Sequence, residues 1–311
     1  MKIFKNNGNM VPKSNYNIVT IGSFDGIHLG HLKILETIVK KAKIKNGKSI
    51  IVTFWPHPRE VLKKKENFKL LNTLEEKIKI FEEIKIDYLY IIDFSSNFAK
   101  TKAEDFVKNI LISKLKTNYL VIGYNHHFGY KREGNIDYLK KNEKKFNFDI
   151  ESISKKEIEK ISVSSTRIRK YINNGKIESA NALLGREFSI SGKVVKGDGI
   201  GKKIKFPTAN ILLNKPRKII PKKGVYAVKI LLDKKIYLGM LNIGYRPTIN
   251  KKIKTIEVNI FEFTRPIYGK RIIVSFFKRL RDEKRFLNLN ELKKQLKTDK
   301  KKTLLILNKT L

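Results

Sequence analysis

Short apolar runs alternate with amphipathic stretches through the first 185 residues of the chain. The apolar runs, rich in Ile, Val, Leu and Tyr, predict strands at 18–22, 49–54, 88–92, 119–122 and 149–153. Apolar residues at helical spacing predict helices between them at 32–43, 74–84 and 103–114. This alternation predicts an α/β domain with a parallel sheet, helices on both of its faces, and ligands bound beyond the carboxyl ends of the strands.

The pattern changes after residue 185, where closely spaced strands replace the alternation. Strand-like segments separated by turn residues lie at 187–195, 226–232, 235–242, 253–263 and 271–277. Helical spacing returns only at 289–297. These elements predict an antiparallel β-barrel with a C-terminal helix, so we expect two domains, 1–185 and 186–311.

Composition narrows the class of protein without changing the predicted fold. None of the 311 residues is cysteine, which excludes disulfides and metal sites built on thiolates. The first residues lack the apolar stretch of a signal peptide, and no apolar run approaches the length of a membrane span. We therefore expect a cytoplasmic protein that has no membrane partner and is a monomer or a weak homo-oligomer.

The chain is strongly basic, with 68 Lys and Arg residues against 29 Asp and Glu and a formal charge of +39. Such a charge favours nucleic-acid binding when it gathers on one surface. Here the lysines are spread through every segment, and Ile and Asn, which share A- and T-rich codons with Lys, are abundant as well. We expect a base-composition bias and no dedicated nucleic-acid surface, although a basic protein still attracts polyanions such as nucleotides.

Two histidines follow the first predicted strand, in the segment 24–31, Phe-Asp-Gly-Ile-His-Leu-Gly-His. Their spacing of three places His28 and His31 on one face of a helix that begins there. The N–H groups at a helix start favour anions, so the imidazoles are candidate donors to a phosphate. The glycines in and before this segment would let a backbone or a nucleotide approach closely. The alternative is a helix start with two solvated histidines.

Two more clusters have the composition of an anion site. The segment 122–129, Ile-Gly-Tyr-Asn-His-His-Phe-Gly, follows a predicted strand and therefore lies at the ligand-facing edge of the sheet. The segment 164–169, Ser-Ser-Thr-Arg-Ile-Arg, opens a helix with serines suited to cap it and arginines suited to clamp phosphate. Each cluster alone is equally typical of a turn or a helix cap.

Together with 22–31, 53–58 and 161–169, the segment 125–129 resembles the nucleotidyltransferase half of the bacterial bifunctional riboflavin kinases/FMN adenylyltransferases, the prokaryotic FAD synthetases. The resemblance implies a Rossmann-like domain that makes FAD and pyrophosphate from FMN and ATP with Mg²⁺. It implies that His28 and His31 are catalytic, holding the ATP phosphates and stabilising charge in the transition state. The residues that it implies in ATP and phosphate binding are Gly22, Ser23, Phe24, Asp25, Gly30, Asn125, Ser164, Thr166 and Arg169.

Three other histidines of this half receive no catalytic role. The family often has Asp-Phe-Arg-Phe-Gly where this chain has Asn-His-His-Phe-Gly at 125–129, and for His126 and His127 we expect a surface role. His57 lies between two prolines, and we expect it to shape a turn.

The second chemical motif follows the start of the predicted barrel. A glycine-rich stretch at 197–201 can wrap phosphate with backbone N–H groups, and it leads to Lys-Phe-Pro-Thr-Ala-Asn at 205–210. In an extended segment Thr208 and Asn210 point to the same side. A hydroxyl and an amide oxygen side by side are hard ligands, suited to a Mg²⁺ ion that carries phosphates. The alternative is an ordinary hairpin with a strand start.

This half of the chain resembles riboflavin kinase at 206–210, 224–227, 242–248, 256–258, 268–269 and 280–283. Glu257 lies among apolar residues in a predicted strand, where a lone carboxylate is costly unless it is used. The resemblance makes Glu257 the general base that takes the proton from the ribityl 5′-hydroxyl, and Thr208 and Asn210 the ligands of magnesium and phosphate. The ATP- and flavin-binding residues that it implies are Gly199, Gly201, Lys205, Phe206, Pro207, Thr208, Asn210 and Arg281.

Lys205 departs from the family, which usually has glycine immediately before this element. A glycine there indicates a positive φ or a close approach of the backbone to ATP. We expect Lys205 to be repositioned without backbone strain and without a phosphate contact.

The two resemblances imply a bifunctional enzyme that phosphorylates riboflavin to FMN and then adenylylates FMN to FAD, with small-molecule partners only. A class I synthetase-like, tRNA-directed nucleotidyltransferase shares the His-x-Gly-His loop, but its second, lysine-rich catalytic loop is missing from this sequence. A nucleic-acid-binding protein on a degenerate enzyme scaffold is the other alternative. It would bind random RNA in a salt-dependent manner without turnover.

Overall fold

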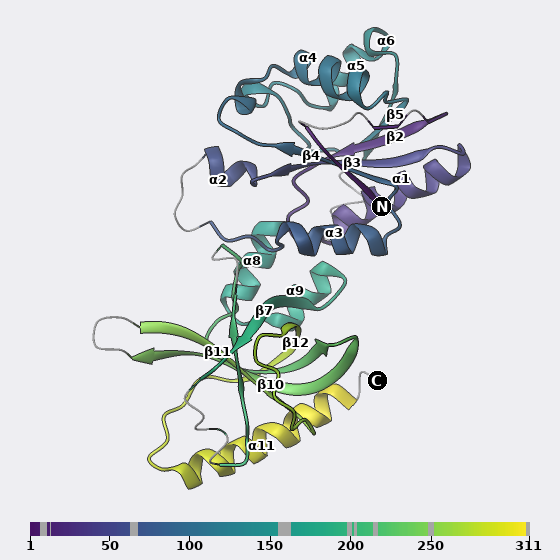
Figure 1. Ribbon diagram of the computed structural model, residues 1–311. Coiled ribbons are helices and arrows are strands. Elements are labelled where there is room, and N and C mark those ends of the chain that lie inside the picture. Colours follow the sequence, from purple (N-terminus) through teal and green to yellow (C-terminus); the bar gives the residue numbers. More distant parts are fainter. Residues whose placement is uncertain are drawn as a thin grey trace. The chain divides into compact units, whose positions relative to one another are not determined.

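Figure 1 shows the computed structural model, which describes residues 1–6, 11–12, 14–62, 68–154, 163–197, 201, 204–213, 217–247 and 252–308. The chain divides into two compact units, Met1–Ser165 and Thr166–Leu311. This division places the helices α8 (Ser165–Asn173) and α9 (Ile177–Leu184) with the second unit, apart from the first residue of α8. The domain boundary expected at 185/186 stays a prediction.

The first unit is built on a parallel sheet of six strands in the order β1-β4-β3-β2-β5-β6. The strands are β1 (Lys2–Lys5), β2 (Asn17–Ile21), β3 (Lys48–Trp55), β4 (Tyr88–Asp93), β5 (Tyr119–Gly123) and β6 (Asp149–Ile153). The five predicted strands are present, which confirms the parallel sheet. The prediction missed β1, because this edge strand is mostly exposed and has no buried apolar run.

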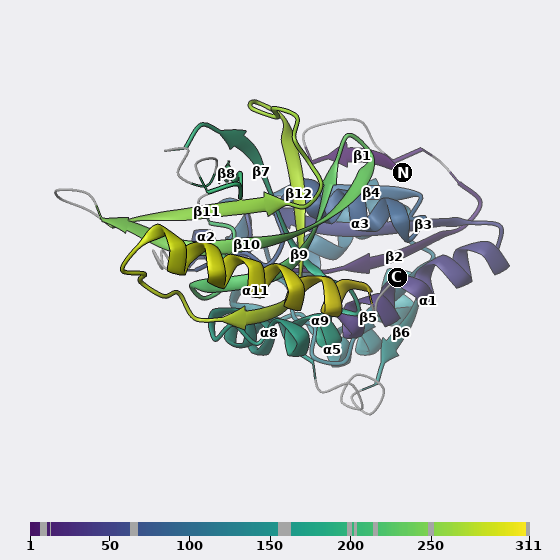
Figure 2. The same cartoon turned by 90° about the horizontal axis from the view of Figure 1, so that it is seen from below.

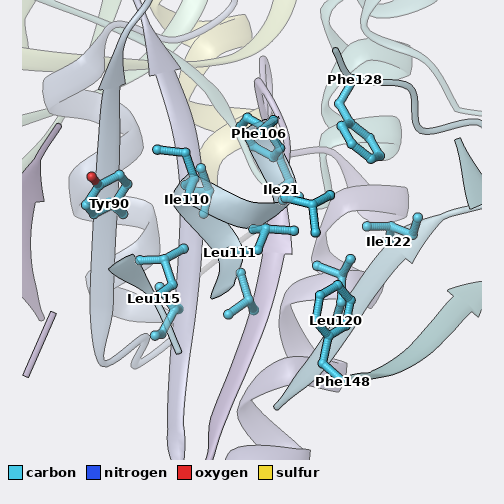
Figure 3. Close-up of a cluster of buried hydrophobic side chains, with 14 of the residues drawn as sticks. Ile21, Tyr90, Phe106, Ile110, Leu111, Leu115, Leu120, Ile122, Phe128 and Phe148 are labelled. Atoms are coloured by element: carbon cyan, nitrogen blue, oxygen red, sulfur yellow. The ribbon is translucent and has the colours of Figure 1, made fainter. Parts of the chain in front are cut away.

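Helices cover both faces of this sheet, as predicted (Figure 1). One face carries α1 (Leu29–Ile44) and α3 (Leu74–Glu83), which share a buried cluster with the strands. The other face carries α4 (Ala103–Phe106), the π-helix η2 (Val107–Lys114), α5 (Ile136–Lys141) and α6 (Glu143–Phe146). Figure 3 shows this second cluster, in which Phe106, Ile110 and Leu111 pack against Ile21 and Leu120 of the sheet. The remaining short helices of this unit are α2 (Pro58–Leu62), η1 (Phe98–Lys100) and η3 (Tyr130–Arg132).

The strand order explains where a ligand can bind in the first unit. From β2 the chain builds the sheet outward through β3 and β4, and it then returns to the other side of β2 with β5 and β6. The order therefore reverses between β2 and β5, and open α/β sheets bind ligands outside the carboxyl ends of the strands at such a point. The segment 24–31 follows β2 and the segment 124–129 follows β5, so the topology brings both to this edge.

The second unit is a closed antiparallel barrel in the order β10-β11-β8-β7-β12-β9, which confirms the predicted barrel. Its strands are β7 (Phe188–Val195), β8 (Ala209–Leu212), β9 (Gly224–Leu232), β10 (Lys235–Pro247), β11 (Lys252–Ile260) and β12 (Arg271–Arg281). The C-terminal helix α11 (Leu289–Asn308) contacts β9, β10 and β12, and Figure 2 shows it lying along the barrel. The prediction missed the short strand β8, and the ends differ most for β10, β12 and α11, which continue beyond Asn242, Phe277 and Lys297.

Candidate active sites

Three residues of the loop between β2 and α1 have positive φ angles. Phe24, Gly26 and Ile27 have φ values of +44°, +93° and +41°. The left-handed region costs a residue with a Cβ about 1–3 kcal/mol, and a β-branched residue such as Ile27 rarely adopts it. Phe24 and Ile27 are 2% and 0% exposed, so burial of their side chains helps to hold this conformation. The loop is therefore fixed before any ligand arrives.

Asp25 anchors this loop to two neighbouring segments. Its Oδ1 accepts hydrogen bonds from the backbone N–H groups of Leu71 and Asn72, at 3.0 and 3.3 Å. Its carbonyl oxygen accepts a hydrogen bond of 2.7 Å from the hydroxyl of Ser165. Asp25 is 2% exposed, and its carboxylate stabilises the conformation of the loop through these hydrogen bonds.

His28 and His31 form a stacked pair where α1 begins. Their ring centroids are 3.7 Å apart and the ring planes differ by 13°. His28 is the N-cap residue, and its Nδ1 accepts a hydrogen bond of 3.3 Å from the N–H of His31. In a neutral imidazole whose Nδ1 accepts, Nε2 carries the proton and is a donor. The spacing of three thus places both imidazoles together at a helix N-terminus, as the sequence predicts.

The segment 163–165 packs against the same loop. A Cβ atom built on Gly30 would lie 3.2 Å from Cγ1 of Val163, so this close approach favours glycine at position 30. With the hydroxyl of Ser165 on the Asp25 carbonyl, the start of the Ser-Ser-Thr element lies beside the histidines. Thr166 and Arg169 belong to α8 in the second unit, and their phosphate contacts stay predictions. Residues 161 and 162 lie outside the described residues.

The loop after β5 corrects one expectation. Asn125 and His127 are exposed, and Nη2 of Arg132 donates to Nδ1 of His127 at 3.0 Å. His126 is half-buried rather than exposed: its Nε2 is buried and its ring stacks on Phe128 with centroids 6.0 Å apart, so the ring does not have the surface role expected for it. Burial, with the nearby charges of His127 and Arg132, lowers the pKa of His126 to about 4. His126 is therefore a neutral packing residue.

His57 directly precedes α2 and hydrogen-bonds to the first turn of this helix. It is 4% exposed, its Nδ1 accepts a hydrogen bond of 3.1 Å from the N–H of Arg59, and its ring packs on Phe68. Its own N–H donates to a carboxylate oxygen of Glu60 at 3.0 Å.

Lys77 is a residue of this region that the sequence analysis missed. It is 0% exposed, and its Nζ donates a hydrogen bond of 2.6 Å to the carbonyl oxygen of Ser23. Burial lowers the pKa of Lys77 to about 8, although the charges of Asp25 and Glu60 act in the opposite direction. The signal was present in the sequence, since Lys77 interrupts the apolar face of α3 between Leu74 and Phe81.

In the second unit, strand register brings the predicted kinase residues into one row. Glu257 of β11 pairs with Asn210 of β8 on one side and with Asn242 of β10 on the other. Asn242 pairs with Val225 of β9, which pairs with Arg281 of β12. Residues directly opposite each other on neighbouring strands point to the same face of a sheet. The expected base, one expected metal ligand and the expected flavin-binding arginine therefore share one face of the barrel wall.

Except for Asn210, the residues of this row line a cavity of ≈ 290 Å³ between the barrel and α11. Its apolar lining includes Met240 of β10 with Leu292 and Leu296 of α11. Its polar lining residues are Thr208, Asn242, Glu257, Asn259, Arg281, Glu283 and Lys284. A concave, mainly apolar space with a few polar groups is typical of a small-molecule site.

A second cavity of ≈ 430 Å³ adjoins the first at Thr208. It is lined by Val194, Pro207–Ala209, Val258, Ile260 and residues 263–268. Nδ2 of Asn259 donates a hydrogen bond of 2.7 Å to the carbonyl oxygen of Pro207, which fixes the backbone just before Thr208. Asn259 was not singled out from the sequence, and its burial beside this turn is what identifies it. Thr208 thus stands between two spaces that could hold two different substrates.

A close backbone approach explains one glycine of the second motif. A Cβ atom on Gly201 would clash with the carbonyl oxygen of Phe206, whereas one on Gly197 would clash with the side-chain Nδ2 of Asn210. Gly199 lies outside the described residues. Lys205 has a φ of +62°, so the expectation of a position without backbone strain was wrong. Lys205 adopts the left-handed conformation that suits the glycine usual in the family.

Comparisons with known proteins identify the family that each half of the chain resembles. Residues 11–167 match the family model described as FAD synthetase, and residues 184–307 match that of riboflavin kinase. The chain is 42% identical to the bifunctional riboflavin kinase/FMN adenylyltransferase of Buchnera aphidicola subsp. Schizaphis graminum over 305 residues, with 96% of each chain covered. It is 36% identical over 283 residues to the protein of that name from Escherichia coli K12, which covers 91% of this chain and 90% of the relative.

A solved structure is similar over almost the whole chain. It is a crystal structure named as a macrolide-efflux protein from Streptococcus pneumoniae, with a TM-score of 0.88, 30% identity, and coverage of 97% of this chain and 98% of that one. Among the residues that our structure describes, no helix combines the length and hydropathy needed to cross a membrane. The two family matches in this order, with relatives at 36–42% identity over most of their length, show that the chain belongs to the bifunctional riboflavin kinase/FMN adenylyltransferase family.

Proposed function

We propose that the second unit uses Glu257 to phosphorylate riboflavin and that the first unit uses the His28–His31 pair to adenylylate the FMN so formed. The observation that carries the proposal is the row of cross-strand partners from Asn210 through Glu257 to Arg281, in which Asn242, Glu257 and Arg281 line one cavity. The activities themselves, riboflavin kinase and FMN adenylyltransferase, are those of the family to which the chain belongs.

For the kinase step, Glu257 takes the proton from the 5′-hydroxyl of the ribityl chain. The hydroxyl oxygen then bonds to the γ-phosphorus of ATP, the bond to the β-phosphate breaks, and ADP leaves. The flavin occupies the cavity that Glu257 and Arg281 line, and ATP occupies the cavity on the other side of Thr208. The meeting of the two spaces at Thr208 supports this arrangement, because phosphoryl transfer needs both substrates in line.

The proposal includes a magnesium ion, for which Thr208 and Asn210 are the proposed ligands. The described residues include no group of three His, Cys, Asp or Glu side chains that could hold a metal, so the ion would depend on phosphate oxygens and water. The Thr208 hydroxyl and the Asn210 amide oxygen fit Mg²⁺, which prefers hard oxygen ligands and keeps several waters. When bound, the ion neutralises charge on the phosphates.

For the adenylyl transfer, the FMN phosphate is already an anionic nucleophile, so no strong base is needed. One of its oxygens bonds to the α-phosphorus of ATP, the bond to the β-phosphate breaks, and pyrophosphate leaves. Catalysis then depends on alignment and on donors that face the developing charge. We assign that role to His28 and His31, with Asn125 positioning the nucleotide or flavin. The residues proposed to close over the phosphates are Ser164, Thr166 and Arg169.

The cellular location of the protein and its oligomeric state are also part of the proposal. A cytoplasmic location supplies both units with ATP, and a base-composition bias explains the basic charge without a nucleic-acid partner. We expect a monomer or a weak homo-oligomer.

Chromatography of riboflavin incubated with the full chain, ATP and Mg²⁺ tests the proposal. FMN and then FAD should appear in succession. Absence of both products, with a salt-dependent shift of random RNA by the same preparation, would favour the nucleic-acid-binding alternative.

A further inference from the structure

A fully buried lysine lies beneath the loop that carries the predicted phosphate donors. Lys77 of α3 is 0% exposed, and lysine is almost never fully buried unless its charge is paired or used. An apolar side chain of similar length would fill the same volume without the cost of removing an ammonium from water. The position therefore calls for an explanation beyond packing.

The ammonium of Lys77 contacts segments that the sequence assigns to the site. Its Nζ donates to the carbonyl oxygen of Ser23 at 2.6 Å, and it lies 5.8 Å from the centre of the Trp55 ring at the end of β3. The charged groups that face it are the carboxylates of Asp25, in the same loop, and Glu60, in α2. Lys77 is thus a buried cation of α3 that lies against the loop between β2 and α1.

The hydrogen bond from Lys77 to Ser23 fixes the orientation of the peptide group that joins Ser23 to Phe24. In a trans peptide the C=O and the following N–H point in opposite directions. Because Lys77 draws the Ser23 carbonyl towards α3, the N–H of Phe24 points away from α3. Phe24 has a φ of +44°, which is uncommon for a residue with a Cβ, so the hydrogen bond from Lys77 helps to hold this orientation.

We propose that Lys77 is a positioning residue for adenylyl transfer, which orients the Ser23–Phe24 peptide so that its N–H donates to a phosphate of ATP. The buried charge also raises the positive potential of the loop at the place where the triphosphate would bind. This inference rests on the proposed function of the first unit. Lys77 itself does not contact the reacting atoms; it acts through the backbone.

The variant Lys77→Met tests the inference, and Lys79→Met is its matched control. Met has a similar length and no charge, and Lys79 is an exposed lysine of the same helix. We expect kcat/KM for ATP in FAD formation to fall about ten- to a hundredfold in Lys77→Met, the range of one lost charged hydrogen bond. The KM for FMN and riboflavin phosphorylation by the same chain should not change. Lys79→Met should behave as the unmodified chain.

Thermal unfolding separates this role from a structural one. Lys77→Met removes a desolvated charge but also leaves the Ser23 carbonyl oxygen without its donor, so kcat/KM is compared at a temperature at which the unfolding curves show both variants folded. Equal kcat/KM values for Lys77→Met and Lys79→Met would overturn the inference. An unmodified chain that makes no FAD from FMN would instead contradict the proposed function.

A pH profile of the unmodified chain gives a test that needs no variant. The pKa of Lys77 is lowered to about 8, mainly by burial, while Asp25 and Glu60 favour its charged form. FAD formation should therefore fall as the pH rises through about 8, and riboflavin phosphorylation should not fall with it. A rate of FAD formation that stays constant well above pH 8 would contradict the role of the charge.

Discussion

The carboxylate of Asp299 holds the guanidinium of Arg281 with both of its oxygens. Nε of Arg281 lies 3.2 and 3.0 Å from Oδ1 and Oδ2, and Nη2 lies 2.7 Å from Oδ2. Asp299 is 1% exposed in α11, and Gln295 donates a further hydrogen bond of 2.9 Å to its Oδ1. The arginine that lines the proposed flavin cavity is therefore fixed by the C-terminal helix, which makes α11 a part of the kinase site.

Asp299→Asn should impair the kinase and leave the adenylyltransferase intact. Asparagine keeps the shape and one acceptor oxygen, but it leaves the charge of Arg281 without its buried partner. Breaking a buried pair on one side costs about 3 kcal/mol or more, which urea unfolding of the second unit would measure. The KM for riboflavin should rise, while FAD formation from added FMN stays unchanged. Asp282→Asn, at an exposed carboxylate beside Arg279, is the control, and equal effects of both variants would contradict the assignment.

Glu257→Gln should abolish most FMN formation without affecting the fold. Glutamine keeps the shape of the side chain and loses the proton acceptor, and loss of a general base lowers turnover about a hundred- to ten-thousandfold. FMN supplied to this variant should still be adenylylated to FAD. Normal riboflavin phosphorylation by Glu257→Gln would remove Glu257 from the mechanism.

His31→Ala should abolish FAD formation and leave FMN formation almost unchanged. The variant loses one preorganised donor and the ring that stacks on His28, and such a donor contributes about a hundredfold or more to turnover. Chromatography of products from riboflavin should then show FMN accumulating. Equal loss of both products would indicate misfolding or a shared site.

The two compact units suggest a comparison of two fragments. Asn181 of α9 donates to the carbonyl oxygen of Phe276 and accepts from the N–H of Phe188, both at 2.8 Å. A fragment 166–311 keeps these bonds, whereas 186–311 loses them together with the buried Ile177 and Leu184. At about 1.5–3 kcal/mol per buried apolar side chain, we expect 166–311 to be the more stable fragment in urea unfolding. A fragment 186–311 of equal stability would support the boundary expected from the sequence.

Most strands could be predicted because their side chains repeat a burial pattern. In β2 all five residues are buried, and in β7 buried positions alternate regularly. The ends of β12 and α11 could not be predicted, and the reasons differ. Irregular register between Phe276 and Arg281 breaks the alternation of β12. In α11 two of the three buried residues, Asp299 and Thr303, are polar, so no apolar stripe marks the last turns.

In the candidate sites, too, local spacing could be predicted from the sequence and contacts between distant residues could not. Motif spacing predicted the pairing of His28 with His31, because three residues along a helix fix the geometry locally. The apolar face of α3 marks the buried position of Lys77 but not its role, which, like that of Asp299, depends on a partner distant in sequence. The hydrogen bond from Lys77 to Ser23 spans 54 positions, and no pattern of composition records it.

Lys205→Gly should stabilise the second unit. Lys205 has a φ of +62°, where a residue with a Cβ is disfavoured by about 1–2 kcal/mol and glycine is not. Glycine also makes the unfolded chain more flexible, so we expect a net gain of about 0.5–1 kcal/mol in urea unfolding. Lys234→Gly is the matched control, because Lys234 has a φ of +65° in the turn between β9 and β10. Both variants should gain similar stability, and the KM for ATP of the kinase should stay unchanged or fall. A tenfold or larger rise in that KM, confined to Lys205→Gly, would show that this lysine contacts a phosphate.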